Sequence, residues 1–139
     1  MIVHSILVVD DDAGTLKVMR QVLEPLGYVV TVAGSGRQAL RLLRQERVDL
    51  VVTDLLMPDG DGFELIASLS KDFADLHILA ISGGGQVGAD TYLTIARGLG
   101  VDVVLQKPIV REDLMMAIKA VEARTTGRSP RPPRPPKKH

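Results

Sequence analysis

The sequence predicts an α/β fold in which a doubly wound, five-stranded parallel sheet is flanked by five helices. Five apolar runs alternate along the chain with segments whose apolar residues recur at helical spacing, as expected for strands that are each followed by a helix. Each run is short and bounded by polar or turn residues, which is typical of strands buried on both faces of a parallel sheet. Polar groups directly follow three of the runs, namely Asp10 and Asp11, Asp54, and Lys107.

The first strand and the first helix have the clearest boundaries. The run ILVV at Ile6–Val9 is wholly apolar and predicts a strand. Leucine and methionine residues recur at three-to-four-residue spacing over 13–26, which predicts a helix. Asp12 is placed to cap the start of this helix and Gly27 to end it, and Pro25 should fray its last turn.

The rest of the chain repeats this alternation. Apolar, β-branched runs at 28–33 and 48–53 predict the second and third strands, and helical spacing between them predicts a helix. The turn at Gly60 precedes the third helix, and a glycine-rich loop precedes the fourth. The remaining strands are predicted over 78–81 and 103–106, and the helices after the first over 37–45, 61–70, 90–99 and 112–123.

The composition is that of a single globular domain. The chain has 139 residues, of which 45% are hydrophobic, and a mean hydropathy of +0.15. It has no cysteine, which excludes disulfides and thiolate chemistry. The first residues lack the layout of a signal peptide, and no apolar run approaches the roughly 20 residues of a membrane span. We therefore expect a cytoplasmic protein without a membrane-spanning segment.

Charge is unevenly distributed along the chain. Residues 124–139 carry six Arg and Lys and no acid, so residues 1–123 hold the other eleven basic residues against all 17 acidic ones, a net charge of −6. An acidic body disfavours nucleic-acid binding by the globular part. We expect one domain over 1–123 and a disordered, basic, proline-rich tail over 124–139. The tail is either an inert terminus, a tether for anionic partners or a proline-motif ligand.

The polar strand ends predict one chemical site. The carboxyl ends of parallel strands meet at one edge of the sheet, which brings Asp10, Asp11, Asp54 and Lys107 together. Clustered carboxylates repel one another unless a hard divalent cation lies among them, and Mg²⁺ prefers carboxylates, waters and phosphate oxygens. One carboxylate can then attack a phosphoryl group while Lys107 offsets charge on its oxygens. The residues thus indicate an aspartyl-phosphate site.

Four ordered segments resemble a single family: VVDDD at 8–12, VVTDLLMPDGDG at 51–62, AISGG at 80–84 and GVDVVLQKP at 100–108. Over roughly residues 6–123, the chain is similar to the receiver domain of two-component response regulators. The resemblance implies a flavodoxin-like fold. Because no output domain follows the last predicted helix, we expect a stand-alone, CheY-like receiver.

The resemblance also implies the metal site and the phosphoacceptor. It assigns the phosphoacceptor role to Asp54. Asp10 and Asp11 match the acid pair that holds Mg²⁺, with Asp54 and the backbone carbonyl of Leu56 as further ligands. The expected cofactor is therefore Mg²⁺.

Two further residues match the family's pattern. Ser82 matches the hydroxyl that turns toward the phosphoryl group, and Lys107 matches the invariant cation. The implied function is acceptance of a phosphoryl group from a phosphohistidine of a sensor histidine kinase or a histidine phosphotransfer protein, which switches binding to a downstream protein target. Such a protein is not a turnover enzyme, because it catalyses only its own phosphorylation and dephosphorylation.

Three features depart from the family's pattern. Val104 stands where an aromatic residue commonly follows the state of the hydroxyl residue, so the usual aromatic switch is absent. Ile109 stands where Phe is common after Lys-Pro, and the stretch over 82–100 is longer than expected. These changes leave the chemistry intact and put the route of signal output in question.

Each site residue also has a plainer interpretation. The acids at 10–12 could cap the first helix, Asp54 could be a turn residue, Ser82 could only begin a glycine turn, and Lys107 could be a solvated surface cation. Two other classes of protein remain open. One is a metal-dependent phosphatase or phosphotransferase built on an Asp-x-Asp pair, which lacks a cap domain here. The other is a receiver-fold interaction module that does not switch.

Overall fold

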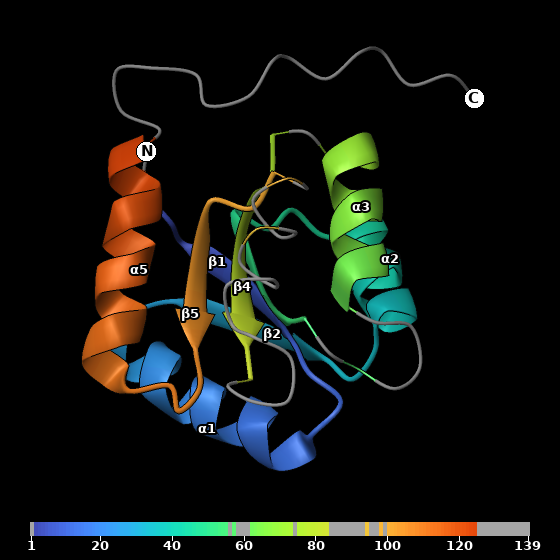
Figure 1. Ribbon diagram of the computed structural model, residues 1–139. Helices are drawn as coiled ribbons and strands as arrows, with labels where there is room; N and C mark the ends of the chain where they lie inside the picture. Colours follow the sequence, from blue (N-terminus) through green and yellow to red (C-terminus); the bar gives the residue numbers. More distant parts are fainter. Residues whose placement is uncertain are drawn as a thin grey trace.

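The structure is a computed structural model and describes residues 2–55, 57, 62–73, 75–83, 94, 98 and 100–124. Five parallel strands form one sheet in the order β2-β1-β3-β4-β5 (Figure 1). The strands are β1 (Ser5–Val9), β2 (Val29–Ala33), β3 (Leu50–Asp54), β4 (His77–Ser82) and β5 (Val103–Gln106). The described helices are α1 (Ala13–Leu23), α2 (Gly36–Gln45), α3 (Gly62–Asp72) and α5 (Arg111–Arg124).

The strand order confirms the predicted doubly wound sheet. The chain passes from β1 outward to β2, returns across β1 to β3, and continues through β4 to β5. The winding direction therefore reverses between β1 and β3. Open parallel sheets bind ligands outside the carboxyl ends of the strands at such a switch point.

Two hydrophobic cores cover the two faces of the sheet. Along β1, Leu7 and Val9 pack with residues of α2 and α3, whereas Ile6 and Val8 pack with residues of α1 and α5. Figure 1 shows α1 and α5 on one side of the sheet and α2 and α3 on the other. Because successive strand residues point to opposite faces, a strand between two helical layers must be apolar throughout, as this run is.

The first helix ends earlier than predicted. The α-helix stops at Leu23, and Glu24–Leu26 form one turn of 3₁₀ helix with Pro25 in its first positions. Proline lacks the N–H that would continue the α-helical ladder, which accounts for the change. Gly27 then reverses the chain with a φ of 100°, a left-handed conformation that glycine adopts without steric cost.

Several other boundaries differ from the prediction by one or two residues. β3 begins at Leu50 and includes Asp54, which is the last residue of the strand. α2 begins one residue earlier because Ser35 caps it, its Oγ accepting the Gln38 N–H at 3.1 Å. α3 and α5 each extend beyond their predicted ends, and α5 begins one residue earlier.

Parts of the prediction lie outside the described residues. Only Thr94 and Gly98 of the helix expected over 90–99 are described, and both are helical. The tail is outside from residue 125 onward. Among the described residues, no helix has the length and apolar character needed to cross a membrane.

Candidate functional site

The predicted site residues lie along the carboxyl edge of the sheet. Asp10 follows β1, Asp54 ends β3, Ser82 ends β4 and Lys107 follows β5. β1, β3, β4 and β5 are consecutive neighbours, and the register of β1 and β3 brings Asp10 level with Asp54. The structure thus brings together residues that are separated by up to about a hundred positions in sequence, as the reversal of winding predicts.

Three carboxylates form the centre of this edge. Asp10, Asp11 and Asp54 each offer one oxygen, and these oxygens all lie within 4.8 Å of one another. Asp10 and Asp54 are only 2% and 6% exposed, while Asp11 is exposed to solvent. A set of hard oxygen donors with one side open to water fits Mg²⁺, which keeps several waters when it binds to proteins. The fourth expected ligand, the backbone carbonyl of Leu56, lies outside the described residues.

The ammonium group of Lys107 contacts two of these acids. Its Nζ donates to Asp54 Oδ2 at 3.2 Å and lies 3.8 Å from Asp10 Oδ2. Partial burial disfavours the ammonium form, but the charges of Asp54 and Asp10 outweigh this effect and raise the pKa of Lys107. The residue therefore stays positively charged at neutral pH, beside the oxygen that it holds.

Burial and a neighbouring carboxylate both disfavour the charged form of Asp10. Burial raises the pKa of Asp10, and the charge of Asp54 acts in the same direction. The N–H of Asp12, which donates to Asp10 Oδ1 at 2.9 Å, and the charge of Lys107 act against this increase without cancelling it. A cation placed among the carboxylates would favour the charged form of Asp10.

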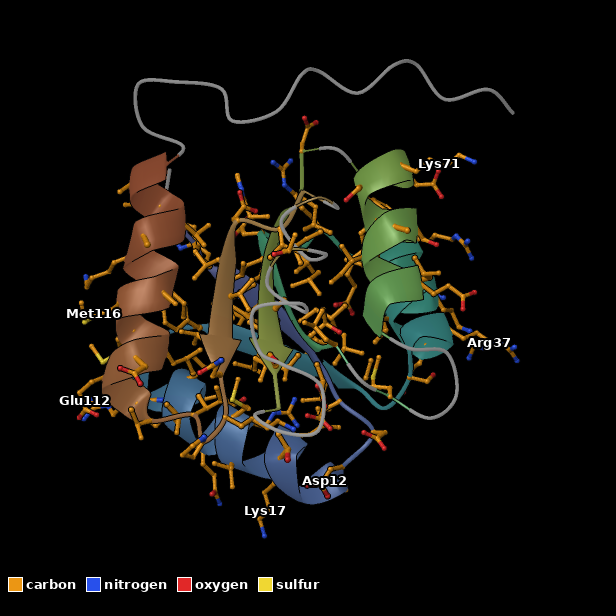
Figure 2. All side chains as sticks on the ribbon, viewed as in Figure 1. Asp12, Lys17, Arg37, Lys71, Glu112 and Met116 are labelled. Carbon is orange, nitrogen blue, oxygen red and sulfur yellow. The ribbon has the colours of Figure 1, made fainter. Side chains whose placement is uncertain are left out.

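Asp12 has a different role from the two acids that precede it. Its carboxylate caps α1, accepting the Gly14 N–H at 3.3 Å and the Thr15 hydroxyl at 2.7 Å. These hydrogen bonds, that from the Thr15 hydroxyl foremost, lower the pKa of Asp12. The capping interpretation is therefore right for Asp12, whereas Asp10 and Asp11 belong to the acidic cluster. The labelled Asp12 side chain lies at the start of α1 in Figure 2.

Ser82 lies between the end of β3, which carries Asp54, and Lys107 after β5. It is 1% exposed, and its backbone carbonyl accepts the Lys107 N–H at 2.8 Å. Its hydroxyl donates to the Gly83 carbonyl at 3.4 Å. On the other side, the Leu55 N–H donates to the carbonyl of Ile81 at 2.9 Å and joins the end of β3 to β4. Ser82 is thus held by backbone bonds at the edge where Asp54 and Lys107 meet.

Gly62 is a residue that the sequence analysis did not single out. Its N–H donates to the Leu55 carbonyl at 3.0 Å, so the start of α3 lies directly against the segment that carries Asp54. A Cβ at this position would stand 1.9 Å from the Asp54 carbonyl oxygen, which leaves room only for hydrogen. The available signal was the glycine that ends the motif at 51–62, since an isolated glycine often marks a close approach of two backbones.

A cavity of about 760 Å³ opens beside Lys107, between α1 and the start of α5. Its walls are mainly apolar and include Val18, Met19, Ile109 and Val110. Val18 and Val110 are also two of the large apolar side chains exposed on the described surface. The acidic site therefore borders an apolar groove.

The two substituted aromatic positions have defined environments. Val104 pairs with Ala80 of β4, is half-buried, and packs against the core on the α2–α3 face. Ile109 packs against the core on the α1–α5 face and lines the cavity beside Lys107. Neither side chain has an aromatic ring that can change rotamer. Of the lengthened stretch over 82–100, only residues 82, 83, 94, 98 and 100 are described.

Known proteins share this architecture. Residues 6–119 match the family described as the response regulator receiver domain. The chain is 38% identical over 123 residues to the response regulator MprA of Mycolicibacterium vanbaalenii, covering 87% of this chain and 51% of that protein. It is 36% identical over 122 residues to the probable transcriptional regulator ycf27 of Guillardia theta, covering 88% of this chain and 46% of that protein. The chain thus spans about half the length of these relatives.

Solved structures of receivers have the same fold. A response regulator receiver domain from Clostridium thermocellum superposes with a TM-score of 0.79 at 27% identity, covering 88% of this chain and 97% of that one. The chemotaxis response regulator CheY4 of Vibrio cholerae gives 0.77 at 25% identity, with 86% and 98% covered. The fold is therefore the flavodoxin-like fold of receiver domains. The chain belongs to the receiver-domain family of two-component response regulators.

Membership of this family carries general properties. Receiver domains generally bind Mg²⁺ at an acidic cluster, and Asp10, Asp11 and Asp54 form an acidic cluster in this chain. They interact with kinases or phosphotransfer proteins and with downstream targets.

Proposed function

We propose that this domain accepts a phosphoryl group on Asp54 and that the modification switches its binding to a protein partner. The observation that carries the proposal is the contact of 3.2 Å between Lys107 Nζ and Asp54 Oδ2 inside a cluster of three carboxylates. A buried carboxylate held by a cation at a ligand-binding sheet edge is placed for nucleophilic attack. Asp12, the other acid in the segment, is held in the helix cap.

The chemistry requires little from the protein beyond positioning and charge. An Asp54 oxygen forms a bond to phosphorus as the P–N bond of a phosphohistidine breaks, and the electron pair leaves with the imidazole. Asp10, Asp11 and Asp54 would hold Mg²⁺, which when bound offsets the charge of the carboxylates and of the phosphoryl oxygens. Lys107 contributes a positive charge of its own, 3.2 Å from Asp54 Oδ2.

The same residues support a switch that acts only on itself. Ser82 lies buried beside the phosphoacceptor edge, where its hydroxyl can donate to a phosphoryl oxygen after release from the Gly83 carbonyl. Hydrolysis of the aspartyl phosphate then returns the domain to its first state. The protein therefore undergoes its own phosphorylation and dephosphorylation and turns over no separate substrate.

The proposed phosphoryl donor is a histidine kinase or a histidine phosphotransfer protein, and the recipient of the signal is a downstream protein target. We expect this exchange to take place in the cytoplasm. The acidic body disfavours nucleic acid as the partner of the globular part. The proposal concerns the receiver domain alone, because the matched region is about half the length of the curated relatives.

Intact-mass spectrometry after incubation with acetyl phosphate and Mg²⁺ tests the proposal. The wild type should gain the mass of one phosphoryl group, and Asp54→Asn should gain none. Asp12→Asn is the matched control, because it removes a neighbouring acid that caps α1 and should still be phosphorylated. An adduct that persists in Asp54→Asn, or a wild type that stays unmodified, would contradict the assignment. Sustained release of many equivalents of phosphate would indicate a phosphatase instead.

A further inference from the structure

Two aspartates hold the opposite edge of the sheet, where the strands begin. Asp49 immediately precedes β3, and its N–H donates to the Ser5 carbonyl of β1 at 3.1 Å. Its Oδ2 accepts the N–H groups of Ser5 at 3.1 Å and His4 at 2.9 Å. The residue therefore both donates to and accepts from the first residue of the neighbouring strand.

Asp102 repeats this arrangement on the next pair of strands. It immediately precedes β5, and its N–H donates to the Ile78 carbonyl of β4 at 2.9 Å. Its Oδ2 accepts the Ile78 N–H at 2.8 Å and lies 3.5 Å from His77 Nδ1. The Asp102 side chain is only 2% exposed. We call this arrangement an aspartate clamp: the backbone N–H of an aspartate donates to one residue of the neighbouring strand, and its carboxylate accepts the N–H of that same residue.

Each clamp lies the same number of residues before a residue of the proposed site. Asp49 lies five residues before Asp54, and Asp102 lies five residues before Lys107. A parallel strand rises about 3.3 Å per residue, so five residues span about 16 Å from one edge of the sheet to the other. A shift of a clamped end along its strand would therefore carry Asp54 or Lys107 toward or away from the carboxyl edge.

The contacts that depend on strand alignment lie at the carboxyl ends of the strands. The β4–β5 ladder ends with the Lys107 N–H donating to the Ser82 carbonyl, and Lys107 Nζ then reaches Asp54 Oδ2. β5 is an edge strand among the described elements and has only β4 as a strand neighbour. Its bonds to another strand are therefore those of that one ladder and of the clamp at its start.

We propose that Asp102 is a positioning residue for Lys107, and that Asp49 acts in the same way for Asp54. The proposal rests on the proposed function, because the two positioned residues are the phosphoacceptor and its cation. The carboxylate of Asp102 fixes the amino end of β5 on β4. This sets the height at which Lys107 meets Asp54 about 16 Å away.

Removal of the Asp102 carboxylate tests the proposal on the full chain. In Asp102→Ala, the NMR signal of the Lys107 side-chain Cε should shift, and phosphorylation of Asp54 at a fixed acetyl phosphate concentration should slow by up to about a hundredfold, the effect of roughly 1 Å of misplacement. Asp102→Asn keeps an oxygen that accepts the Ile78 N–H. It should restore the signal and most of the rate. If Asp102→Ala does not fold, Asp102→Ser replaces it in the same comparison.

Val121→Ala is the matched control for lost stability. It truncates a buried side chain of α5 and removes no bond at a strand end. It should leave the Lys107 signal and the phosphorylation rate unchanged at a temperature where every variant is folded. The positioning role is wrong if Val121→Ala alters both readouts as Asp102→Ala does, if Asp102→Ala alters neither, or if Asp102→Asn fails to restore them. A wild type that accepts no phosphoryl group refutes the proposed function instead, and the Lys107 signal then tests the positioning role alone.

Discussion

Gly62→Ala should destabilise the domain and disturb β3, the strand that carries Asp54. The added Cβ would stand 1.9 Å from the Asp54 carbonyl oxygen, 2.7 Å from the Leu55 Cα and 2.8 Å from the Asp54 carbonyl carbon. All three are backbone atoms, so no rotamer change can make room, and the start of α3 must move away from the end of β3.

The size of the effect follows from two destabilising contributions and one that opposes them. Overpacking of this kind costs about 1–3 kcal/mol. Loss of the bond from the Gly62 N–H to the Leu55 carbonyl adds about 1 kcal/mol. Replacing a helical glycine by alanine returns up to about 1 kcal/mol. We therefore expect the free energy of unfolding to fall by about 1–3 kcal/mol, together with slower phosphorylation of Asp54.

Urea denaturation and phosphorylation by acetyl phosphate measure these two effects. Gly14→Ala is the matched control, because the nearest atoms to its Cβ would be the Asp12 carboxylate oxygens at 3.6 and 3.8 Å, ordinary contacts. It should be neutral or stabilising and should leave phosphorylation unchanged. If Gly62→Ala were as stable as Gly14→Ala and accepted phosphoryl groups at the wild-type rate, the close approach would not constrain the site.

Three further predictions concern the metal, pH and the lifetime of the signal. Mg²⁺ at about 100 times its dissociation constant should add about 2.7 kcal/mol to the free energy of unfolding. Asp54→Asn should stabilise the metal-free protein and weaken the stabilisation by Mg²⁺. A wild-type melting temperature that does not change with Mg²⁺ would count against the metal site. Burial opposes the charge of Asp49, but the N–H groups of His4 and Ser5 outweigh it and lower its pKa. Its stabilisation should therefore be complete above the ordinary carboxyl pKa of about 3.9 and be lost as pH falls through the lowered folded value, so acid denaturation of Asp49→Asn should show a shallower loss of stability below that range. Leu56 and Gly84 have no side-chain group that can orient an attacking water, so phosphorylated Asp54 should decay slowly compared with receivers that carry a polar pair at these positions. A variant with both Leu56→Asn and Gly84→Glu should lose the phosphoryl group faster than the wild type after removal of the donor, and equal decay would rule out this explanation.

Local sequence determined most of the secondary structure and the identity of the chemical groups. The apolar run at 6–9 predicted β1, and all five strands formed within two residues of their predicted ranges. Asp12 and Gly27 were predicted to bound the first helix, and they cap α1 and end the 3₁₀ turn that follows it. Asp54 and Lys107 could be selected because each directly follows a short, predominantly apolar run. Such features depend on periodicity and on backbone preferences within a few residues, which a sequence displays directly.

Tertiary structure decided what each polar side chain contacts. Three consecutive acids, Asp10 to Asp12, look alike in sequence, yet only the first two join Asp54 because the third turns to the N–H groups that begin α1. Asp102 carries no local signal of its contacts, and the glycine at 62 signals a close approach without indicating its partner, since the atoms that constrain both residues belong to other segments of the chain. Strand adjacency and register bring these distant segments within bonding distance. Those relations arise only when the whole sheet is assembled, because each depends on how neighbouring strands and helices pack rather than on the residues beside it in sequence.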